Sequence, residues 1–437
     1  MAAPELMAAT PVGAATTEFS GKVGRNAKWI GTPRRDAYAQ PAMSGSSSGT
    51  ARAQDRLFTP AFIALTVADL AYFTAAGLLV LATPLFASGP LGADAVGVGI
   101  AVGAFSVTAL VLRPWAGRES DRRGRRPLLV AGALLGAVAI AGHALTTTLL
   151  VLIGLRLVLG VAEALFFVAG FALLADLAPP NRAGEALSFN SLALYLGIAF
   201  GPSLGELLIG IGGFNLAWMG GAALGLAAAA LALRLPKGET RPPGLQGPAP
   251  LIHRGVIWPS VGLFSGVAAM AGFLAFVAIY GRDDLAMSGS GPVLLVFGLT
   301  VVGTRIAFAK LPDRVPPYRL AGTALAAMAV GLAITGTVTS VAGLFVGAAL
   351  LGVGVAFVTP AFFAAMMARV RPSERGAAFG TVSIFLDLAF GGGPVLLGLL
   401  ADAAGIPAAF LVAALVPAAG AVGTLIMSRR VPALGAA

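Results

Sequence analysis

The sequence contains no cysteine and only two histidines. The missing thiols exclude disulfides and thiolate metal sites. His143 and His253 lie far apart near predicted loop ends, so we expect no metal and no cofactor. Charge is scarce as well, since 11% of the residues are charged whereas soluble domains have roughly a quarter. Such scarcity over 437 residues argues against a soluble fold.

Motifs for chemistry on a bound substrate are also missing. The chain has no phosphate-binding P-loop, no cluster of metal ligands and no serine or cysteine nucleophile in a recognisable setting. We therefore expect that the protein is not an enzyme. Without an ATP-binding loop, its energy source should be an ion gradient.

Long apolar runs are what the chain does contain. Hydrophobic residues make up 57% of it, and they form runs of the ~20 residues that a helix needs to cross a bilayer. The pattern predicts an all-α integral membrane protein with twelve transmembrane helices. The predicted spans are 58–87, 93–113, 127–147, 149–176, 183–211, 215–235, 256–280, 291–311, 319–338, 341–369, 376–401 and 405–428.

The two ends differ from the apolar body. Residues 1–57 are rich in Ala, Ser, Thr, Gly and Pro and contain no apolar signal-peptide core. We expect a disordered cytoplasmic tail there, and a short cytoplasmic tail over residues 429–437. We hypothesise that Met43 is the true start; a native peptide from residues 1–42, found by mass spectrometry, would exclude this.

A polar break rich in Pro and Gly, residues 236–255, comes after the sixth span. It predicts a cytoplasmic linker between two six-helix halves, 58–235 and 256–428.

An internal repeat supports two related halves. Pro180–Gly184 leads into span five and Pro372–Gly376 leads into span eleven, at an offset of 192 residues. The same offset maps Gly201-Pro202 onto Gly393-Pro394. Duplicated halves are typical of transporters, whose substrate site lies near the bilayer midplane where the halves meet.

Lysine and arginine gather on one predicted side of the membrane. With the N-terminus inside, the predicted outer loops hold a single arginine, Arg282. This positive-inside pattern predicts cytoplasmic N- and C-termini. It also explains the net charge of +10 by topology, so we expect no nucleic-acid partner. The inner loops carry Arg118, Arg122, Arg123, Arg125, Arg126, Arg182, Lys237, Arg241, Arg254, Lys310, Arg314, Arg319, Arg369, Arg371, Arg375, Arg429 and Arg430.

The segment Gly117–Arg126, GRESDRRGRR, forms the predicted loop between spans two and three. Its glycines allow a tight turn and close backbone approach. The pattern G-x-x-x-D-R-x-G-R-R resembles the hallmark loop of the major facilitator superfamily, which locks the cytoplasmic side of the halves in the outward-open state. The matching segment of the second half, Lys310–Arg314, keeps only an Asp-Arg pair. The resemblance gives the gating role to Gly117, Asp121, Arg122, Gly124 and Arg125.

An arginine, Arg156, falls inside span four. It costs roughly 2.5–3.5 kcal/mol at the bilayer centre, so it should have a partner or line a water-filled cavity. The alternative is that its side chain reaches the outer interface. With Gly160 it resembles the R-x-x-x-G motif of the superfamily, which is associated with proton transfer, although Leu159 replaces the glutamine common there.

Span five carries the sequence GIAFGPSLG. Small residues at four-residue spacing let helices pack closely, and a proline adds a kink that a neighbouring helix can support. The pattern G-x-x-x-G-P-x-x-G resembles the antiporter motif of the drug exporters in the superfamily, which favours export over import. Plain helix packing is the alternative. The motif residues are Gly197, Gly201, Pro202 and Gly205.

Three acids fall near the predicted midplane: Asp69, Glu163 and Asp387. Carboxyl groups inside a membrane are functional candidates by default. Glu163 lies seven residues after Arg156, so the two share a helix face. Aromatic neighbours of Asp69 and Asp387 suit a lipophilic cation. We predict that these four charged residues carry proton coupling and substrate recognition; structural pairing is the alternative.

The predicted function is secondary active transport, namely proton-coupled efflux of small hydrophobic or cationic compounds, such as drugs or natural products, by alternating access. The choice of protons rests on the resemblance. An importer of sugars or other metabolites is a second interpretation, disfavoured by the few Asn and Gln in the spans. A membrane receptor or signalling subunit is a third. Expected partners are the substrate, protons and the lipid bilayer, for a monomer in the cell inner membrane.

Overall fold

A computed structural model describes residues 57–179, 182–238, 252–367, 370–371 and 374–430. The chain divides into two units, Met1–Ala51 and Arg52–Ala437, and all of the described residues belong to the second. The predicted N-terminal tail, Met43, most of the linker, the C-terminal tail and the first residues of both repeat motifs lie outside the described residues. Within them the chain is helical and forms no strand, which confirms the predicted all-α fold.

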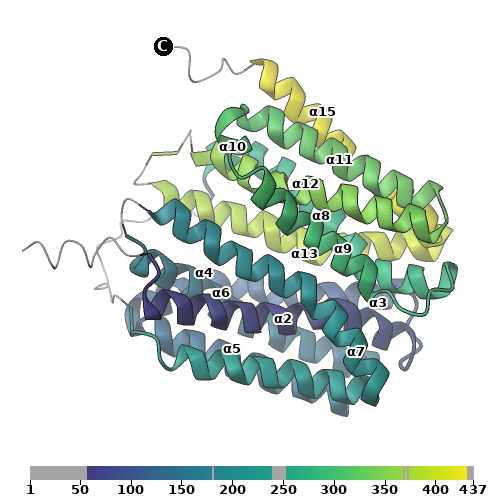
Figure 1. Ribbon diagram of the computed structural model, residues 1–437, viewed down its shortest axis with the longest axis horizontal. Helices are drawn as coiled ribbons and strands as arrows, with labels where there is room; N and C mark the ends of the chain where they lie inside the picture. Colours follow the sequence, from purple (N-terminus) through teal and green to yellow (C-terminus); the bar gives the residue numbers. More distant parts are fainter. Residues whose placement is uncertain (1–56, 180–181, 239–251, 368–369, 372–373, 431–437) are drawn as a thin grey trace, which may run out of the picture. The chain divides into compact units, whose positions relative to one another are not determined.

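In the described residues before the linker, the chain forms six α-helices, whose arrangement can be followed in Figure 1. Helix α2 is capped by Thr59, whose hydroxyl accepts a hydrogen bond from the Phe62 amide at 3.1 Å. Asp94 caps α3 in the same way through the Gly97 amide at 2.7 Å. The elements are α2 (Pro60–Ser88), α3 (Ala95–Gly103), α4 (Phe105–Arg123), α5 (Arg125–Gly142), the 3-10 turn His143–Leu145, α6 (Leu149–Leu177) and α7 (Ala183–Ala232).

The second half repeats this arrangement of long apolar helices and short turns. Its elements are the 3-10 turn Arg254–Val256, α8 (Ile257–Ile279), the π-helical turn Tyr280–Asp284, α9 (Gly291–Ala307), α10 (Leu311–Arg314), α11 (Pro317–Thr337), α12 (Val341–Met367), α13 (Arg375–Ala404), α14 (Ile406–Ala413) and α15 (Leu415–Arg430).

Helix α7 contains two membrane spans. A straight helix of its 50 residues would be about 75 Å long, more than twice the ~30 Å of the hydrocarbon layer. The backbone leaves the helical conformation at Gly212 and Gly213, where φ of Gly213 is +70°. Gly220 then lies against Leu208, whereas residues 12 apart in a straight helix are about 18 Å apart. The chain therefore reverses at these glycines.

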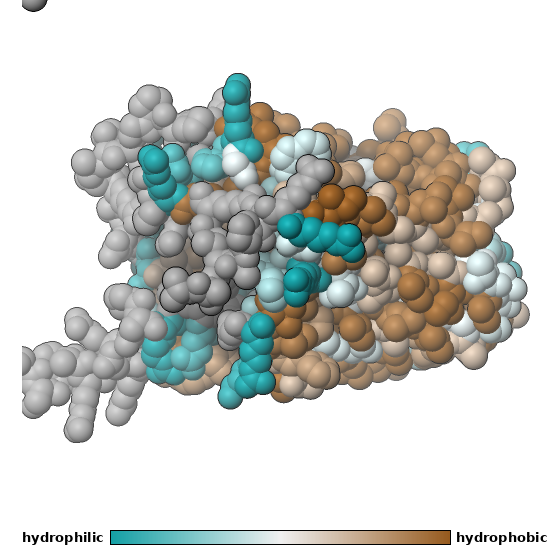
Figure 2. Space-filling model, turned by 90° about the horizontal axis from the view of Figure 1, so that it is seen from above, coloured by the Kyte–Doolittle hydropathy of each residue, from teal (hydrophilic) through white to brown (hydrophobic). Residues whose placement is uncertain are grey.

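The described helices account for the predicted spans. Ten are long and apolar enough to cross a membrane, when α3 with α4 and α14 with α15 are each taken as one. The second span of α7 and the shorter apolar helix α9 bring the number to twelve. Apolar side chains such as Val111 and Val138, 68% and 67% exposed, cover the outside. Figure 2 shows this apolar surface, with hydrophilic side chains gathered toward one end.

The hallmark segment differs from its prediction in one respect. Residues 117–123 are not a loop, because α4 continues to Arg123 and the chain turns only at Gly124, where φ is +91°. Glu119 pairs with Arg123 one turn later and supports the polar end of α4. Asp121 pairs with Arg125, the first residue of α5, and so joins the two helices across the turn. Gly117 therefore lies within α4, on the side that faces Val168 of α6.

The two halves pack their helices in the same order. In the first half α2 packs on α7, α4 on α6, and α5 on both α6 and α7. In the second half α8 packs on α13, α9 on α12, and α11 on both α12 and α15. We name the end of the bundle that bears Arg118, Arg122 and Arg123 the arginine-rich end, and the opposite end the Arg282 end.

The halves meet along two helix pairs that we name the α4–α13 interface, which includes α3, and the α7–α9 interface. Glycines allow both contacts. A Cβ on Gly391 of α13 would touch the Ser106 hydroxyl, and a Cβ on Gly298 of α9 would overlap Ala199 of α7. These two contacts are equivalent, because 106 and 298, like 199 and 391, are 192 positions apart.

Candidate functional site

An ion pair joins the halves within the α4–α13 interface. The Nε atom of Arg113 on α4 lies 2.9 Å from Oδ2 of Asp387 on α13. Asp387 is 2% exposed, so the pair is largely withdrawn from water. The Arg113 guanidinium also lies over the ring of Phe167 on α6, 4.8 Å from its centroid. Arg113 is thereby held between one helix of its own half and one of the other half.

A second carboxylate faces the same arginine. Glu163 lies on α6 one turn before Phe167, and it interacts electrostatically with both Arg113 and Asp387. The Tyr72 hydroxyl of α2 donates a hydrogen bond to it. Arg113, Glu163 and Asp387, which we name the central cluster, therefore hold one cation and two carboxylates from three helices and both halves.

Asp69 lies beside the central cluster but within the first half. The Asn190 amide of α7 donates a hydrogen bond to Asp69 Oδ2 at 2.7 Å, and both residues are 4% exposed. The Thr66 hydroxyl lies 3.5 Å from Asn190 Oδ1. Asp69 also interacts electrostatically with Glu163. The hydrogen bond between Asp69 and Asn190 thus connects α2 to α7 next to the central cluster.

Arg156 finds its partners in backbone carbonyls. Its Nε donates to Ala101 O at 3.1 Å and its Nη2 to Val102 O at 2.8 Å, while the guanidinium lies 5.1 Å from the Phe105 ring centroid. These carbonyls belong to the last turn of α3, just before the break at Ala104. A cation at a helix C-terminus is favourable, so Arg156 joins α6 to this break.

The hallmark residues at the arginine-rich end contact their own half. Arg125 is buried; its Nη1 donates to Asp121 Oδ1 at 2.6 Å and its Nε lies 3.3 Å from Asp176 Oδ2 on α6. The Arg125 amide donates to the Lys237 carbonyl at 2.7 Å. Gly124 permits this approach, because a Cβ there would meet the same carbonyl. Arg122 is exposed. The side chain of Asp313, in the matching segment of the second half, lies outside the described residues.

The antiporter-motif glycines bring α7 against α2. A Cβ on Gly197 would meet the backbone of Phe73 and Thr74. Gly201 and Gly205 lie against Leu78 in the same way. Pro202 is buried within α7. The motif therefore forms the close helix contact inside the first half that its small residues indicated.

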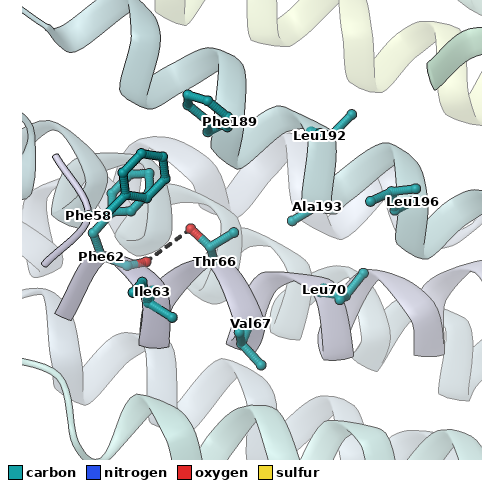
Figure 3. A pocket seen from close by; sticks show the side chains of 10 residues that line it. All are labelled: Phe58, Phe62, Ile63, Thr66, Val67, Leu70, Phe189, Leu192, Ala193 and Leu196. Atoms are coloured by element: carbon teal, nitrogen blue, oxygen red, sulfur yellow. Dashed lines mark hydrogen bonds between the residues drawn. The ribbon is translucent and has the colours of Figure 1, made fainter. Parts of the chain in front are cut away.

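An open groove lies between α2 and α7, with a volume of about 240 Å³ (Figure 3). Nine of its ten lining residues are apolar, and Thr66 is the polar one. Thr66 connects the groove to Asn190, and through it to Asp69. On the α7 side, Leu192 and Leu196 line the groove on both sides of Tyr195 in the sequence.

Sequence reasoning missed the two arginines of the interfaces, Arg113 and Arg305. Arg113 was assigned to the end of a span, although it is the direct partner of Asp387. Arg305 on α9 donates from Nη2 to the Tyr195 hydroxyl of α7 at 2.9 Å, with its guanidinium 4.0 Å from the ring centroid. The repeat could have revealed both, since 113 and 305, like 195 and 387, are 192 positions apart.

Glu206 joins the halves near the Arg282 end. Its Oε1 accepts a hydrogen bond from the Ser290 amide at 2.6 Å and its Oε2 one from the Gly291 amide at 3.0 Å. A carboxylate at the N-terminus of α9 satisfies amides that lack a helical partner. Arg282 adds a hydrogen bond from Nη2 to the Ser88 hydroxyl of α2 at 3.2 Å. This end is therefore closed by contacts between the halves.

Apolar spans in two related halves, with charged side chains where the halves meet, define a multi-pass membrane transporter. A family model described as the Major Facilitator Superfamily matches residues 62–340 and 293–436. The chain belongs to this superfamily, which confirms the resemblance of its hallmark segment.

Two curated relatives support this assignment. An uncharacterized MFS-type transporter of Salmonella typhimurium is 28% identical over 349 residues, covering 77% of this chain and 89% of the relative. An uncharacterized MFS-type transporter of Burkholderia pseudomallei is 30% identical over 367 residues, covering 77% and 84%.

Solved transporters share the fold at low identity. The nucleoside transporter NupG matches with a TM-score of 0.71 and 14% identity, over 84% of this chain and 99% of that one. The human organic anion transporter MFSD10 gives 0.64 and 19%, over 83% and 98%. A bacterial homologue of the human lysosomal transporter Spinster, in an inward-facing and occupied conformation, gives 0.67 and 15%, over 88% and 98%. These likenesses show the fold alone.

Proposed function

We propose that this transporter is a proton-coupled exporter of small hydrophobic compounds that works by alternating access. The central cluster carries the proposal. It places one cation beside two carboxylates at the junction of the halves, which leaves one excess negative charge when both acids are ionised. Such a charge is costly in a low-dielectric layer. A single bound proton removes it.

The same proton changes the attraction between the halves. With Asp387 ionised, its pair with Arg113 holds α13 to α4. A proton on Asp387 cancels this attraction. Arg113 then interacts with Glu163, which lies in the same half of the protein as Arg113. Loss of a cross-half pair lowers the free-energy cost of separating the halves, so proton uptake and conformational change become linked. Asp69, close behind, extends the route by which protons reach Glu163.

The surroundings favour an apolar substrate. The groove between α2 and α7 offers almost entirely apolar side chains. Asp69 and Asp387 already have protein partners in Asn190 and Arg113, so we assign the acids to proton coupling and the groove to the substrate. Arg156, held by the carbonyls of α3, positions α6 and thereby Glu163.

Topology and motif support the direction of transport. The arginine-rich end lies in the cytoplasm by the positive-inside rule, which places both termini there in a cytoplasmic (inner) membrane. Glycines of the antiporter-like motif form the contact between α7 and α2, and α7 also contributes to the α7–α9 interface. When the halves move relative to each other at the α7–α9 interface, the helix that bears this motif moves with them. We infer that a monomer is sufficient, since its own two halves form the cluster.

The test is proton-driven uptake of a lipophilic fluorophore into inverted membrane vesicles. Transport should collapse with a protonophore, and Glu163→Gln and Asp387→Asn should remove the proton-driven part. Asp69→Asn should weaken it less. Transport that is indifferent to the protonophore, or unchanged in the Glu163 and Asp387 variants, would reject the proposal.

Glu185 provides the matched control, because it lies in the first turn of α7, before the apolar span that begins at Phe189. Hydrogen bonds from Arg182 hold the pKa of Glu185 below its ordinary value, and its side chain is exposed. Glu185→Gln removes one carboxylate without touching the central cluster. It should transport the fluorophore as the unchanged protein does.

A further inference from the structure

Arg305 is the repeat counterpart of Arg113. The two arginines are 192 positions apart, and so are the residues that they contact across the halves, Tyr195 and Asp387. Neighbouring contacts obey the same rule. Gly160 lies against the Phe105 carbonyl in the first half, as Gly352 lies against that of Phe297 in the second. Arg305 therefore occupies in the α7–α9 interface the place that Arg113 occupies in the α4–α13 interface.

The counterparts of both carboxylates are uncharged. Asp387 corresponds to Tyr195, and Glu163 corresponds to Val355, which is buried in α12. A guanidinium stays charged under all physiological conditions, while a phenol is neutral near pH 7. The second half has thus kept the cation of the central cluster and lost its two anions.

Arg305 is left without a counter-charge in the part of the chain that the structure describes. No ion pair there includes it, and its buried Nε donates to none of the described residues. Its described partner is Tyr195, which receives one hydrogen bond and lies under the guanidinium. Arg305 lies in the last turn of α9, where a cation is favourable at the helix end. Its guanidinium is nevertheless half-buried against Tyr195 in the α7–α9 interface, between the halves.

We propose that Arg305 binds the anionic group of the transported molecule, so that the substrates are amphipathic organic anions. This rests on the proposed transport function and names its substrate class. The guanidinium fork matches a carboxylate or phosphate group. The apolar body of the same molecule fits the groove, because Leu192 and Leu196 line it on either side of Tyr195. The charge of Arg305 on α9 and the apolar side chains of α7 thus lie next to each other at Tyr195.

The experiment uses an aromatic carboxylate fluorophore and its neutral methyl ester, which share one apolar body. Binding to the purified protein is measured first and transport in vesicles second. The unchanged protein should bind the carboxylate about tenfold or more tightly than the ester, as a charge-assisted hydrogen bond implies. Arg305→Gln should abolish this preference while ester binding remains, which shows that the variant is folded.

A second variant places a carboxylate beside Arg305 within the protein itself. Tyr195→Asp copies the chemistry of Asp387 into the α7–α9 interface, so the new carboxylate should neutralise Arg305 and also remove the preference. Arg314→Gln, which removes an exposed arginine of α10, is the control and should keep it. Equal binding of carboxylate and ester by the unchanged protein, or an undiminished preference in Arg305→Gln, would overturn the proposal.

Anionic lipid headgroups are the competing source of the same chemistry. Binding is therefore compared in vesicles of pure phosphatidylcholine and in vesicles that also contain phosphatidylglycerol. A preference that persists in pure phosphatidylcholine supports a substrate site. A preference abolished by phosphatidylglycerol in the unchanged protein, together with binding of that lipid that Arg305→Gln removes, would assign Arg305 to lipid instead. Selective binding of the carboxylate without proton-driven transport would refute the coupling mechanism and leave this site standing.

Discussion

The α4–α13 and α7–α9 interfaces share one backbone plan and differ in their chemistry. In each interface, a glycine allows helices of the two halves to approach closely, and an arginine contacts a residue of the other half. In the first interface Arg113 meets the carboxylate of Asp387, and in the second Arg305 meets the phenol of Tyr195. The two arginines occupy equivalent positions in the two halves, but the residues that they contact differ. In the proposed mechanism the first interface responds to protons, while the second offers a permanent positive charge.

The two interfaces also differ at the Arg282 end, where the carboxylate belongs to the α7–α9 interface. Glu206 of α7 accepts hydrogen bonds from the first amides of α9. Its counterpart in α13 is Gly398, 192 positions later, which packs against the Ala95 carbonyl of α3. Here the α7–α9 interface has the carboxylate, whereas Gly398 of the α4–α13 interface makes close backbone packing. Among the described residues, the α7–α9 interface thus has charged contacts at two depths, Arg305 and Glu206, and the α4–α13 interface has the pair of Arg113 with Asp387.

The largest effect is expected from breaking the ion pair. Asp387→Ala removes the cross-half partner of Arg113 and leaves Glu163, in its own half, as the remaining counter-charge. We therefore expect a loss of about 3 kcal/mol, the lower end of the cost of removing one member of a buried pair. Tyr195→Phe removes the hydrogen bond to Arg305 and keeps the ring under its guanidinium. This change should cost roughly 1.5 kcal/mol, because one partner is charged and Tyr195 is half-buried. Thermal unfolding of the purified variants in detergent measures both. A smaller loss for Asp387→Ala than for Tyr195→Phe would contradict the comparison.

A double variant separates stability from coupling. Arg113→Leu with Asp387→Leu removes the cross-half ion pair, so part of the stability should return, and the remaining loss reflects Glu163 without its cation. Proton-driven transport should stay absent, since the cluster then lacks its cation and one proton acceptor.

A smaller effect is expected from Glu206→Ala. Hydrogen bonds to a charged group contribute roughly 1.5–3 kcal/mol each, part of which water replaces when the interface opens. We expect the open state at the Arg282 end to become about tenfold more populated. The chain has no cysteine, so a single Ser203→Cys beside this contact reports on opening through its labelling rate with a water-soluble maleimide.

The control for this measurement is Asp402→Ala, which removes an exposed acid near the end of α13 without touching α9. Its labelling rate should equal that of Ser203→Cys alone. Equal rates in the Glu206 and Asp402 variants would mean that the carboxylate does not hold the α7–α9 interface closed.

The sequence predicted the spans well because their length is fixed by the hydrocarbon layer, which long apolar runs reveal directly. The extension of α4 was missed, because Arg118 to Arg123 are as polar as a loop and only their four-residue pairing stabilises a helix. The acids Asp69, Glu163 and Asp387 were identified by their scarcity. Their partners were not, since the contact of Arg113 with Asp387 joins helices that are far apart in the chain and depends on their packing.

The smallest effect distinguishes the two glycine contacts. Alanine in place of glycine inside a helix gains about 1 kcal/mol from backbone propensity. At Gly391 the added methyl meets the Ser106 hydroxyl, which can rotate away, so Gly391→Ala should change stability by less than about 1 kcal/mol. At Gly298 it meets the backbone of Ala199, which cannot move unless α7 and α9 separate. Overpacking of this kind costs about 1–3 kcal/mol, so Gly298→Ala should lower the unfolding temperature and Gly391→Ala should not. Equal losses in the two variants would show that Ser106 is held as rigidly as the Ala199 backbone, and that the two interfaces are equally tight at this level.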